Sequence, residues 1–333
     1  TMATYKGIKG VKVVTKTSDP TASEALGTVW YNSTSPTALK YSIQSAGAWA
    51  AGNNLNTPHG QMGIVGGTPA ALCFGGISTD KNTCESFDGS SWSVANTLNQ
   101  GRSYNAGFGS TTAAVTVGGS PQAVTATETW NGSTWTAVPG VLSTGRQKFG
   151  TANNGTTTAG LIFGGQNTPG PPWYSLALVE SWDGTSWTVE TAVTTDREAG
   201  GGVGIGTAAL WISGYDQNPP SGNRANVEEW NGSTWAEETD VNTARQSVCC
   251  SGTITSALLG GGAASPKAYT EQWNGTSWTE VADLGTGREG MGKGAGASGN
   301  DCIGAGADAA APVAILTELW DGAPATIKTV TIS

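Results

Sequence analysis

The chain has 333 residues, of which 12% are charged, and its formal net charge is −9 at pH 7. Such an acidic chain repels phosphate backbones, so the sequence predicts no nucleic-acid binding. It contains no run of 18 or more apolar residues, which predicts no membrane insertion. Fifty glycines favour turns and short strands over helices.

Residues 1–46 differ from the rest of the chain and predict an N-terminal β extension. A basic, strand-like segment covers residues 6–16, and residues 27–32 and Ala38–Ile43 alternate apolar and polar side chains around a Ser/Thr/Pro turn. Alternation of this kind is typical of a β-hairpin.

A short phrase, Glu-x-Trp/Phe-Asp/Asn-Gly, then recurs six times at intervals of 43 to 52 residues. Most repeats contain an arginine, an apolar segment ending in a double glycine, the glutamate phrase and a tryptophan, which is the order expected for four short strands. A repeat of this length and composition predicts a β-propeller with one four-stranded blade per repeat. The copies begin at Glu85, Glu128, Glu180, Glu228, Glu271 and Glu318.

The two ends of the repeat region predict how the propeller closes. The last copy ends at Gly322 without a following tryptophan, whereas Trp49 lies in a fourth-strand phrase with no blade before it. The strand around Trp49 is therefore expected to complete the final blade and hide both open edges. The predicted fold is all-β, with a six-bladed propeller over residues 47–322 and a tail or extra strand over residues 323–333.

The repeat resembles the Kelch repeat of β-propellers across residues 49–322. The resemblance rests on the order of arginine, Gly-Gly, aromatic strand and tryptophan; the two aromatic positions are only five residues apart here, and the first is mostly Trp. A second likeness, between residues 88–92 and the Asp-boxes of sialidases, has a different Asp-to-Gly spacing and is interpreted as a hairpin.

The N-terminal phrase Gly27-Thr-Val-Trp-Tyr-Asn32, followed by Leu39-Lys40, is similar to short modules of bacteriophage tail fibres, and the whole chain resembles Kelch-like virion proteins of marine phages. This resemblance implies a noncatalytic structural protein of a tail fibre, tail or capsid appendage, made in the host cytoplasm and carried in the extracellular particle. Residues 1–46 would bind other virion proteins, and the propeller would bind a host-surface glycan or receptor. A homo-oligomer in the particle is compatible with the sequence.

Charged residues recur at one end of the predicted blades. Arginines open first strands and glutamates open third strands, and these positions share one end because strand direction alternates. The interpretation is a ring of structural ion pairs, with a ligand-binding charge ring as the alternative. The arginines are Arg102, Arg146, Arg197, Arg245 and Arg288, with His59 at the matching place of the first repeat, and they face the six glutamates named above.

The same end carries the loops between second and third strands, which vary most in length. Recognition usually lies in variable loops on a uniform scaffold. The aromatic and polar side chains of the two longest loops suit a sugar or a protein partner, although prolines and aromatics that merely fix the loops to the surface explain them equally well. The candidates are Trp173, Tyr174, Tyr215, Asp216, Asn218, Asn223 and Arg224.

Enzymatic and metal-dependent functions find little support in residue types. His59 is the only histidine, so the sequence predicts no metal site, no cofactor and no enzyme. The alternatives are a glycan-processing, sialidase-like enzyme with its acids in the central channel, and a cellular adaptor propeller. The aromatic pairs that flank each hairpin are expected to pack between blades. A disulfide between Cys73 and Cys84 is left open.

Overall fold

The computed structural model describes residues 14–20, 29–34, 37–43, 47–121, 124–167, 171–292, 296–308, 312–322 and 326–330. The chain forms two compact units, one of residues 48–321 and one of residues 1–47 with 322–333. This division lies within one residue of the predicted boundaries.

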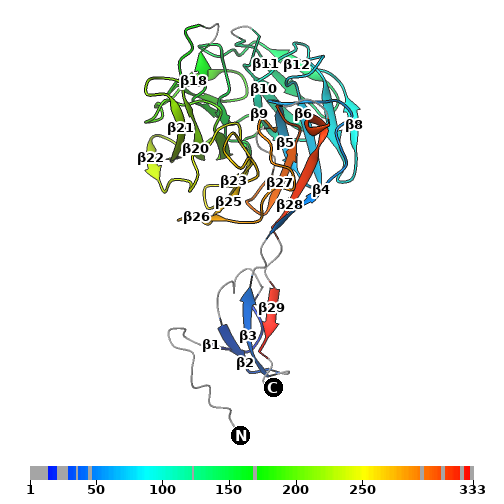
Figure 1. Cartoon of the computed structure of the whole chain (residues 1–333), viewed down its shortest axis with the longest axis vertical. Coiled ribbons are helices and arrows are strands. Elements are labelled where there is room, and N and C mark those ends of the chain that lie inside the picture. The colour runs from blue at the N-terminus through cyan, green and yellow to red at the C-terminus, as the bar shows by residue number, and fades with distance from the viewer. Residues whose placement is uncertain are drawn as a thin grey trace. The chain divides into compact units, whose positions relative to one another are not determined.

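In the larger unit, consecutive strands pair antiparallel into small sheets, here called blades (Figure 1). The first blade contains β5 (Gly63–Gly67), β6 (Ala70–Phe74), β7 (Cys84–Phe87) and β8 (Trp92–Ala95); the second β9 (Ala106–Ser110), β10 (Ala113–Val117), β11 (Thr127–Trp130) and β12 (Trp135–Val138); the third β14 (Gly150–Thr151), β15 (Gly160–Phe163), β17 (Val179–Trp182) and β18 (Trp187–Val189). The fourth contains β19 (Gly201–Ile205), β20 (Ala208–Asp216), β21 (Gly222–Trp230) and β22 (Trp235–Glu238); the fifth β23 (Cys249–Thr253), β24 (Ser256–Gly260), β25 (Thr270–Trp273) and β26 (Trp278–Glu280); the final one β27 (Asp301–Ala305), β28 (Thr317–Asp321) and β4 (Ala48–Ala51).

Two minor elements complete the larger unit, a short strand pair of β13 (Arg146–Gln147) and β16 (Gln166–Asn167) and a 3-10 helix, η1 (Val313–Ile315). The described residues contain no α-helix and no helix that could span a membrane. Serial four-stranded antiparallel sheets make this unit an all-β structure of the β-propeller type.

Strand β4 joins the final blade from the other end of the repeat region. It pairs antiparallel with β28, so that Trp49 lies opposite Trp320 with ring centroids 5.6 Å apart. The indole Nε1 of Trp49 also donates a 2.9 Å hydrogen bond to Thr270 Oγ1 of the fifth blade. The predicted pairing of the Trp49 strand with the last repeat is therefore present.

The smaller unit is a four-stranded sheet in the order β1-β2-β3-β29. Its strands are β1 (Val14–Lys16), β2 (Val29–Asn32), β3 (Ala38–Ile43) and β29 (Thr326–Thr329), so the C-terminal segment supplies an extra strand. Trp30 and Leu39 are buried, and Trp30 Nε1 donates to Asp19 Oδ1 at 3.1 Å. Of the predicted strand over residues 6–16, only β1 lies within the described residues.

The turn between the third and fourth strands has four residues. In the first blade Phe87 pairs with Trp92, and the side-chain oxygen Oδ1 of Asp88 accepts the main-chain N–H groups of Ser90 and Ser91 at 2.9 and 2.7 Å. By accepting these hydrogen bonds, the Asp88 side chain stabilises the four-residue turn, in which Gly89 has a φ of +93°.

The aromatic pairs of the repeat pack in the core, as predicted. Trp130 and Trp135 lie 5.4 Å apart by ring centroid, and Trp135 meets Phe74 of the first blade at 4.9 Å. Both tryptophans are 5% exposed. Because the rings fill the space between neighbouring blades, they are not available to stack on a ligand.

The double glycines let neighbouring blades approach closely. A Cβ on Gly75 would lie 2.6 Å from the carbonyl oxygen of Arg102, and Gly75 and Gly76 have φ of +68° and +100°. In the fifth blade the equivalent pair is Gly261 and Gly262, because β24 continues through Gly260.

Cys73 and Cys84 are both buried and form no disulfide. Phe74 pairs with Cys84, whereas Cys73 pairs with Glu85. Side chains alternate along a strand, so the two thiols lie on opposite faces of the first blade. Burial raises the pKa of Cys84 to about 12, which keeps it protonated and unreactive at neutral pH.

Candidate functional site

In each repeat that has the predicted arginine, the structure pairs this arginine with the predicted glutamate of the same repeat. All the members are buried, and in the first blade His59 Nε2 takes the place of the guanidinium, 3.5 Å from Glu85 Oε1. The pairs are Arg102 with Glu128 (2.6 Å), Arg146 with Glu180 (2.8 Å), Arg197 with Glu228 (2.8 Å), Arg245 with Glu271, and Arg288 with Glu318 (3.2 Å).

The ion pair of the second blade also binds the main chain on both sides. Glu128 accepts the main-chain N–H of Asn99 at 2.8 Å, and Arg102 donates to the carbonyl oxygens of Gly118 and Ala126 at 3.2 and 2.8 Å. With these hydrogen bonds the charges hold the chain that enters the second blade. A buried pair satisfied in this way has little capacity left for a ligand.

Two residues after each arginine position, the main chain forms a closed ring. Six N–H groups each donate to the carbonyl oxygen of the preceding member at 2.6 to 3.0 Å, and the last bond returns to the first residue. All six residues have φ between +51° and +68°. In ring order the members are Gln61, Tyr104, Lys148, Ala199, Ser247 and Gly290.

The ring positions are equivalent in the main chain yet carry six different side chains. Left-handed backbone is unfavourable for residues other than glycine, and strained positions of this kind often accompany functional sites. Around the ring, the arginines, glutamates and glycines repeat, whereas the side chains of the ring members differ. Different side chains at equivalent backbone positions make the centre of the unit a candidate functional site.

Four polar residues gather at this ring and are here called the mouth cluster: Tyr104, Lys148, Glu198 and Asp308. Lys148 Nζ lies 3.0 Å from Glu198 Oε1 and 5.5 Å from the centroid of the Tyr104 ring. Asp308 donates its main-chain N–H to Glu289 at 2.8 Å and lies beside the ring, because a Cβ added to Gly290 would be 2.5 Å from Asp308 Cβ.

The four residues of the mouth cluster differ in exposure, and the charged ones affect the pKa of Tyr104. Asp308 is exposed, Tyr104 and Lys148 are half-buried and Glu198 is buried. Burial raises the pKa of Tyr104, and the negative charges of Asp308 and Glu198 raise it further. Tyr104 therefore stays protonated at neutral pH and can donate a hydrogen bond beside an exposed carboxylate.

The opposite end of the ring's axis has a different chemistry. A hollow of about 530 Å³ is lined there by the turns between first and second strands of several blades, including Ser110, Thr253 and Ala297, and none of its lining residues is a carboxylate. Asn154 crosses this end, since its main-chain N–H donates to Gly204 O and its side chain to Gly252 O, both at 2.9 Å.

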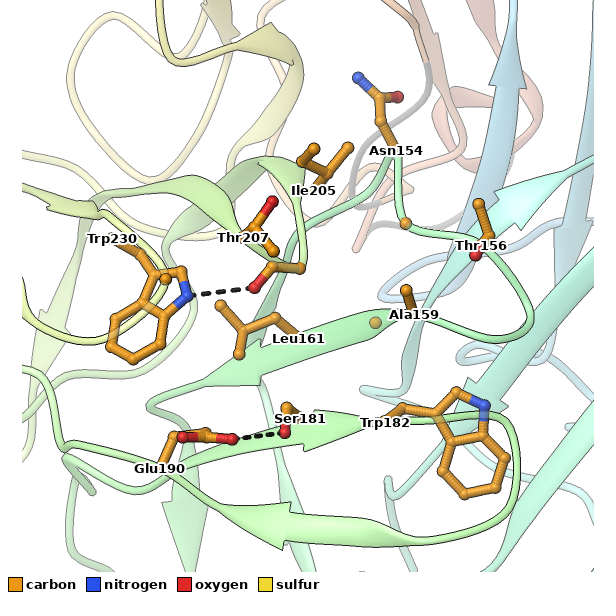
Figure 2. A pocket seen from close by; sticks show the side chains of 14 residues that line it. Asn154, Thr156, Ala159, Leu161, Ser181, Trp182, Glu190, Ile205, Thr207 and Trp230 are labelled. Carbon is orange, nitrogen blue, oxygen red and sulfur yellow. Dashed lines mark hydrogen bonds between the residues drawn. The ribbon is translucent and has the colours of Figure 1, made fainter.

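A further pocket of about 390 Å³ lies between the third and fourth blades (Figure 2). Leu161 and Trp230 supply apolar walls, and its one carboxylate, Glu190, accepts the Ser181 hydroxyl at 2.6 Å. Trp230 Nε1 is bonded to Gly206 O at 3.1 Å. Because these polar groups are already paired with one another, the pocket is a weaker candidate than the mouth cluster.

The predicted loop residues divide into two groups. Trp173 and Tyr174 are 48% and 50% exposed, and their rings remain candidates for contact with a ligand. The segment predicted as the second long loop is instead a hairpin, because β20 and β21 continue until Asp216 pairs with Gly222. Tyr215 lies in β20, where its main chain exchanges two 2.8 Å hydrogen bonds with Glu198.

The polar residues of that hairpin bind within the protein. Arg224 Nη2 donates to Asp216 Oδ2 at 2.7 Å, Asn218 Nδ2 to Asp196 Oδ2 at 3.1 Å, and Asn223 Nδ2 to Ala263 O at 3.1 Å. Their contacts fix the hairpin and the adjacent loop. Sequence reasoning missed the mouth cluster because its members do not repeat; the one available signal was their variety at equivalent positions.

No protein-family model matches the chain, and no curated protein matches it either. Solved structures do match, 233 chains in all, and they include the structure of YjhT. That match has a TM-score of 0.64 and 13% sequence identity, and it covers 83% of this chain and 96% of YjhT. The fold is a β-propeller. At this level of identity the similarity to YjhT establishes the fold alone.

The comparison corrects two predictions from the sequence. The prediction of a noncatalytic virion protein and the prediction that the chain is no enzyme are withdrawn, because the match with YjhT is a match of fold and supports neither of them. The sequence analysis had excluded catalysis because His59 is the only histidine. Proton transfer to a sugar needs only a carboxyl group and a second acid or base, and the mouth cluster brings such groups together.

Proposed function

We propose that the protein is a glycan-processing enzyme whose site is the mouth cluster. The observation that carries the proposal is the convergence of four residues that do not follow the repeat, Tyr104, Lys148, Glu198 and Asp308, on one end of the central ring. Convergent polar groups with a perturbed pKa are candidates for a functional site.

Asp308 and Tyr104 would act as the proton-transferring pair. Asp308 is exposed and reaches an incoming sugar, whereas the phenol of Tyr104 stays protonated and can donate to a ring or glycosidic oxygen. A carboxylate and an acid placed on either side of a sugar oxygen suit general acid–base catalysis, which typically contributes about 10²- to 10⁴-fold in rate.

Lys148 and Glu198 would position this pair. Glu198 is buried beneath Lys148, so it is the partner of the lysine and not a group that meets substrate. The salt bridge holds the ammonium over the Tyr104 ring, where the contact between cation and π-system restricts both side chains. Precise orientation of catalytic side chains can contribute a large part of the rate enhancement of an enzyme.

We further propose that the propeller is a closed, six-bladed, Kelch-like ring. The closed cycle of main-chain hydrogen bonds through six equivalent residues and the pairing of β4 with β28 support it. A density map viewed along the ring axis tests this count; five or seven blades would contradict it.

Trp173 and Tyr174 would provide an additional contact for the glycan away from the reacting bond. Their exposed rings are suited to the apolar faces of sugars. The expected effect of Trp173→Ala is a higher KM with an unchanged kcat, and an unchanged KM would remove this role.

The proposed activity is tested by incubating the full chain with oligosaccharides of varied linkage and following the sugar signals by NMR. The expected result is conversion of at least one glycan at a rate proportional to protein concentration. Asp308→Asn and Tyr104→Phe are expected to reduce it, whereas the exposed Glu280→Gln, at the end of β26, serves as the matched control. Binding of glycans without any conversion would overturn the proposal.

A further inference from the structure

We infer that Gln61, a member of the main-chain ring, binds a sugar hydroxyl group and thereby determines which sugar the mouth cluster accepts. This inference rests on the proposed function and adds a substrate contact to it. It follows from one buried acceptor atom that lacks a partner and from the residues that surround this atom.

The side chain of Gln61 lies beside the neighbouring ring member and reaches the one after it. Its Nε2 donates to Ser247 Oγ at 3.4 Å, two ring positions away. Between them lies Gly290, where an added Cβ would be only 2.8 Å from Gln61 Nε2. Glycine at position 290 therefore leaves the space that the amide occupies.

The carbonyl end of this amide has no partner. Gln61 is 3% exposed, and its Oε1 accepts no hydrogen bond from any residue that the structure describes. A buried acceptor without a donor is unfavourable. The Oε1 atom therefore favours a ligand that supplies an O–H or N–H group.

The amide lies next to the residues that would act on the substrate. The same added Cβ on Gly290 would be 2.5 Å from Asp308 Cβ, so Asp308 and the Gln61 amide flank one small space. Tyr104 follows Gln61 in the ring, and its main-chain N–H donates to Gln61 O at 2.8 Å. A sugar that contacts both Asp308 and Tyr104 therefore comes within reach of Gln61.

A sugar hydroxyl has the chemistry that this position requires. Oε1 only accepts, whereas a hydroxyl group both donates and accepts. The sugar hydroxyl would donate to Gln61 Oε1 and accept the O–H of Ser247, whose oxygen already accepts from Gln61 Nε2. An analogue without this hydroxyl is rejected, because the acceptor then stays buried and unpaired. Gln61 is thus a specificity-determining residue and takes no part in proton transfer.

The experiment measures the binding of methyl glycosides of glucose, galactose, mannose and N-acetylglucosamine. The one that binds most tightly is then compared with its singly deoxygenated analogues. NMR titration of the full chain gives each dissociation constant, and conversion is followed separately. Loss of one particular hydroxyl is expected to weaken binding at least about tenfold. A series in which no single deoxygenation has this effect on the unmodified protein would overturn the inference.

A variant identifies the protein group that the hydroxyl contacts. Gln61→Met keeps the length of the side chain and removes both polar atoms, so it should weaken binding of the parent glycoside about tenfold. The sensitive deoxygenated analogue should bind the variant and the unmodified protein equally well, because its contact is already lost. Equal losses for both glycosides would contradict a direct contact.

Gln272→Met is the matched control for this variant. Gln272 lies in β25, and its amide donates to Gly299 O and Asn300 Oδ1, each at 3.0 Å. Its replacement also removes the hydrogen bonds of a glutamine side chain, yet it should leave glycoside binding unchanged. A loss of binding as large as that of Gln61→Met would contradict the assignment of the hydroxyl to Gln61.

The outcomes separate this inference from the proposed function. Asp308-dependent conversion of a glycan, with no loss of binding in any deoxygenated analogue, would overturn the Gln61 contact and leave the enzyme proposal intact. A Gln61-dependent loss of binding without any conversion would support the contact and contradict catalysis. Binding of none of the glycosides would overturn the inference.

Discussion

Lys148 of the third blade and Glu198, which precedes the fourth, form a salt bridge of 3.0 Å directly at the central ring. Glu198 is buried, whereas the Lys148 side chain is 24% exposed. The pair ties two neighbouring repeats together at the point where their side chains differ most. It also fixes a positive charge over the Tyr104 ring, which links the stability of the centre to the proposed chemistry.

Lys148→Met is expected to lower both stability and activity. The substitution leaves the buried Glu198 without its cation, which should cost about 1 to 3 kcal/mol of unfolding free energy. Urea denaturation and the kcat for the converted glycan measure the two effects. Lys148→Arg keeps the charge and should recover most of both; an equal loss in the methionine and arginine variants would show that charge is not what matters.

The buried ion pairs are expected to dominate the sensitivity of the blades to charge removal. Arg197→Met should destabilise the protein by about 3 to 5 kcal/mol, because Glu228 then remains buried without a partner. Lys267→Met, which removes the exposed partner of Glu289, is the matched control and should cost less than about 1 kcal/mol. Similar losses of unfolding free energy in the two variants would contradict the structural role of the buried arginine–glutamate pairs.

The turn at Asp88 predicts a specific pH dependence. Hydrogen bonds from the main-chain N–H groups of Ser91 and Ser90 lower the pKa of Asp88 to about 2, below its value of about 3.9 in an unfolded chain. The ionised carboxylate therefore stabilises the folded state above about pH 4, and this contribution is lost as the pH falls through about 2.

Asp88→Asn should retain the turn, because Asn131 accepts the same hydrogen bonds in the second blade. Its melting temperature should fall less steeply between pH 4 and pH 2 than that of the unmodified protein. Parallel curves for the two proteins would show that the carboxylate does not contribute.

Strain in the central ring can be relieved at one position without removing a functional group. Ala199 has φ +55°, which glycine adopts at little cost, so Ala199→Gly should raise the unfolding free energy by up to about 1 kcal/mol. Ala209, buried in β20 and absent from the positive-φ residues, is the control, and Ala209→Gly should be destabilising by about 1 kcal/mol. A loss of stability at both positions would contradict the strained geometry of the ring.

The features that recur in every repeat could be predicted from the sequence. Arg102 and Glu128 meet because the repeat places them at the same end of the first and third strands of one blade, and the Trp49 strand was recognised by what the last repeat lacks. The length of the turn was not open to such reasoning, because the Asp88 side chain caps a four-residue connection that Asp-Gly alone does not reveal.

The mouth cluster could not be predicted from the repeat pattern of the sequence. Tyr104 and Asp308 are about 200 residues apart and occupy different places in their repeats, and only the closed cycle of main-chain hydrogen bonds brings them to one centre. Trp173 and Tyr174, by contrast, were identified as exposed aromatic residues because prolines and a variable loop surround them in sequence.

The most direct test of the central claim is the kcat of Asp308→Asn on the converted glycan, measured beside Glu280→Gln. Asp308 is exposed, so its replacement should leave the melting temperature within about 2 °C of the unmodified protein. The account predicts a loss of kcat of at least about 10²-fold for Asp308→Asn and none for Glu280→Gln. A folded Asp308→Asn protein that keeps the full kcat would contradict it.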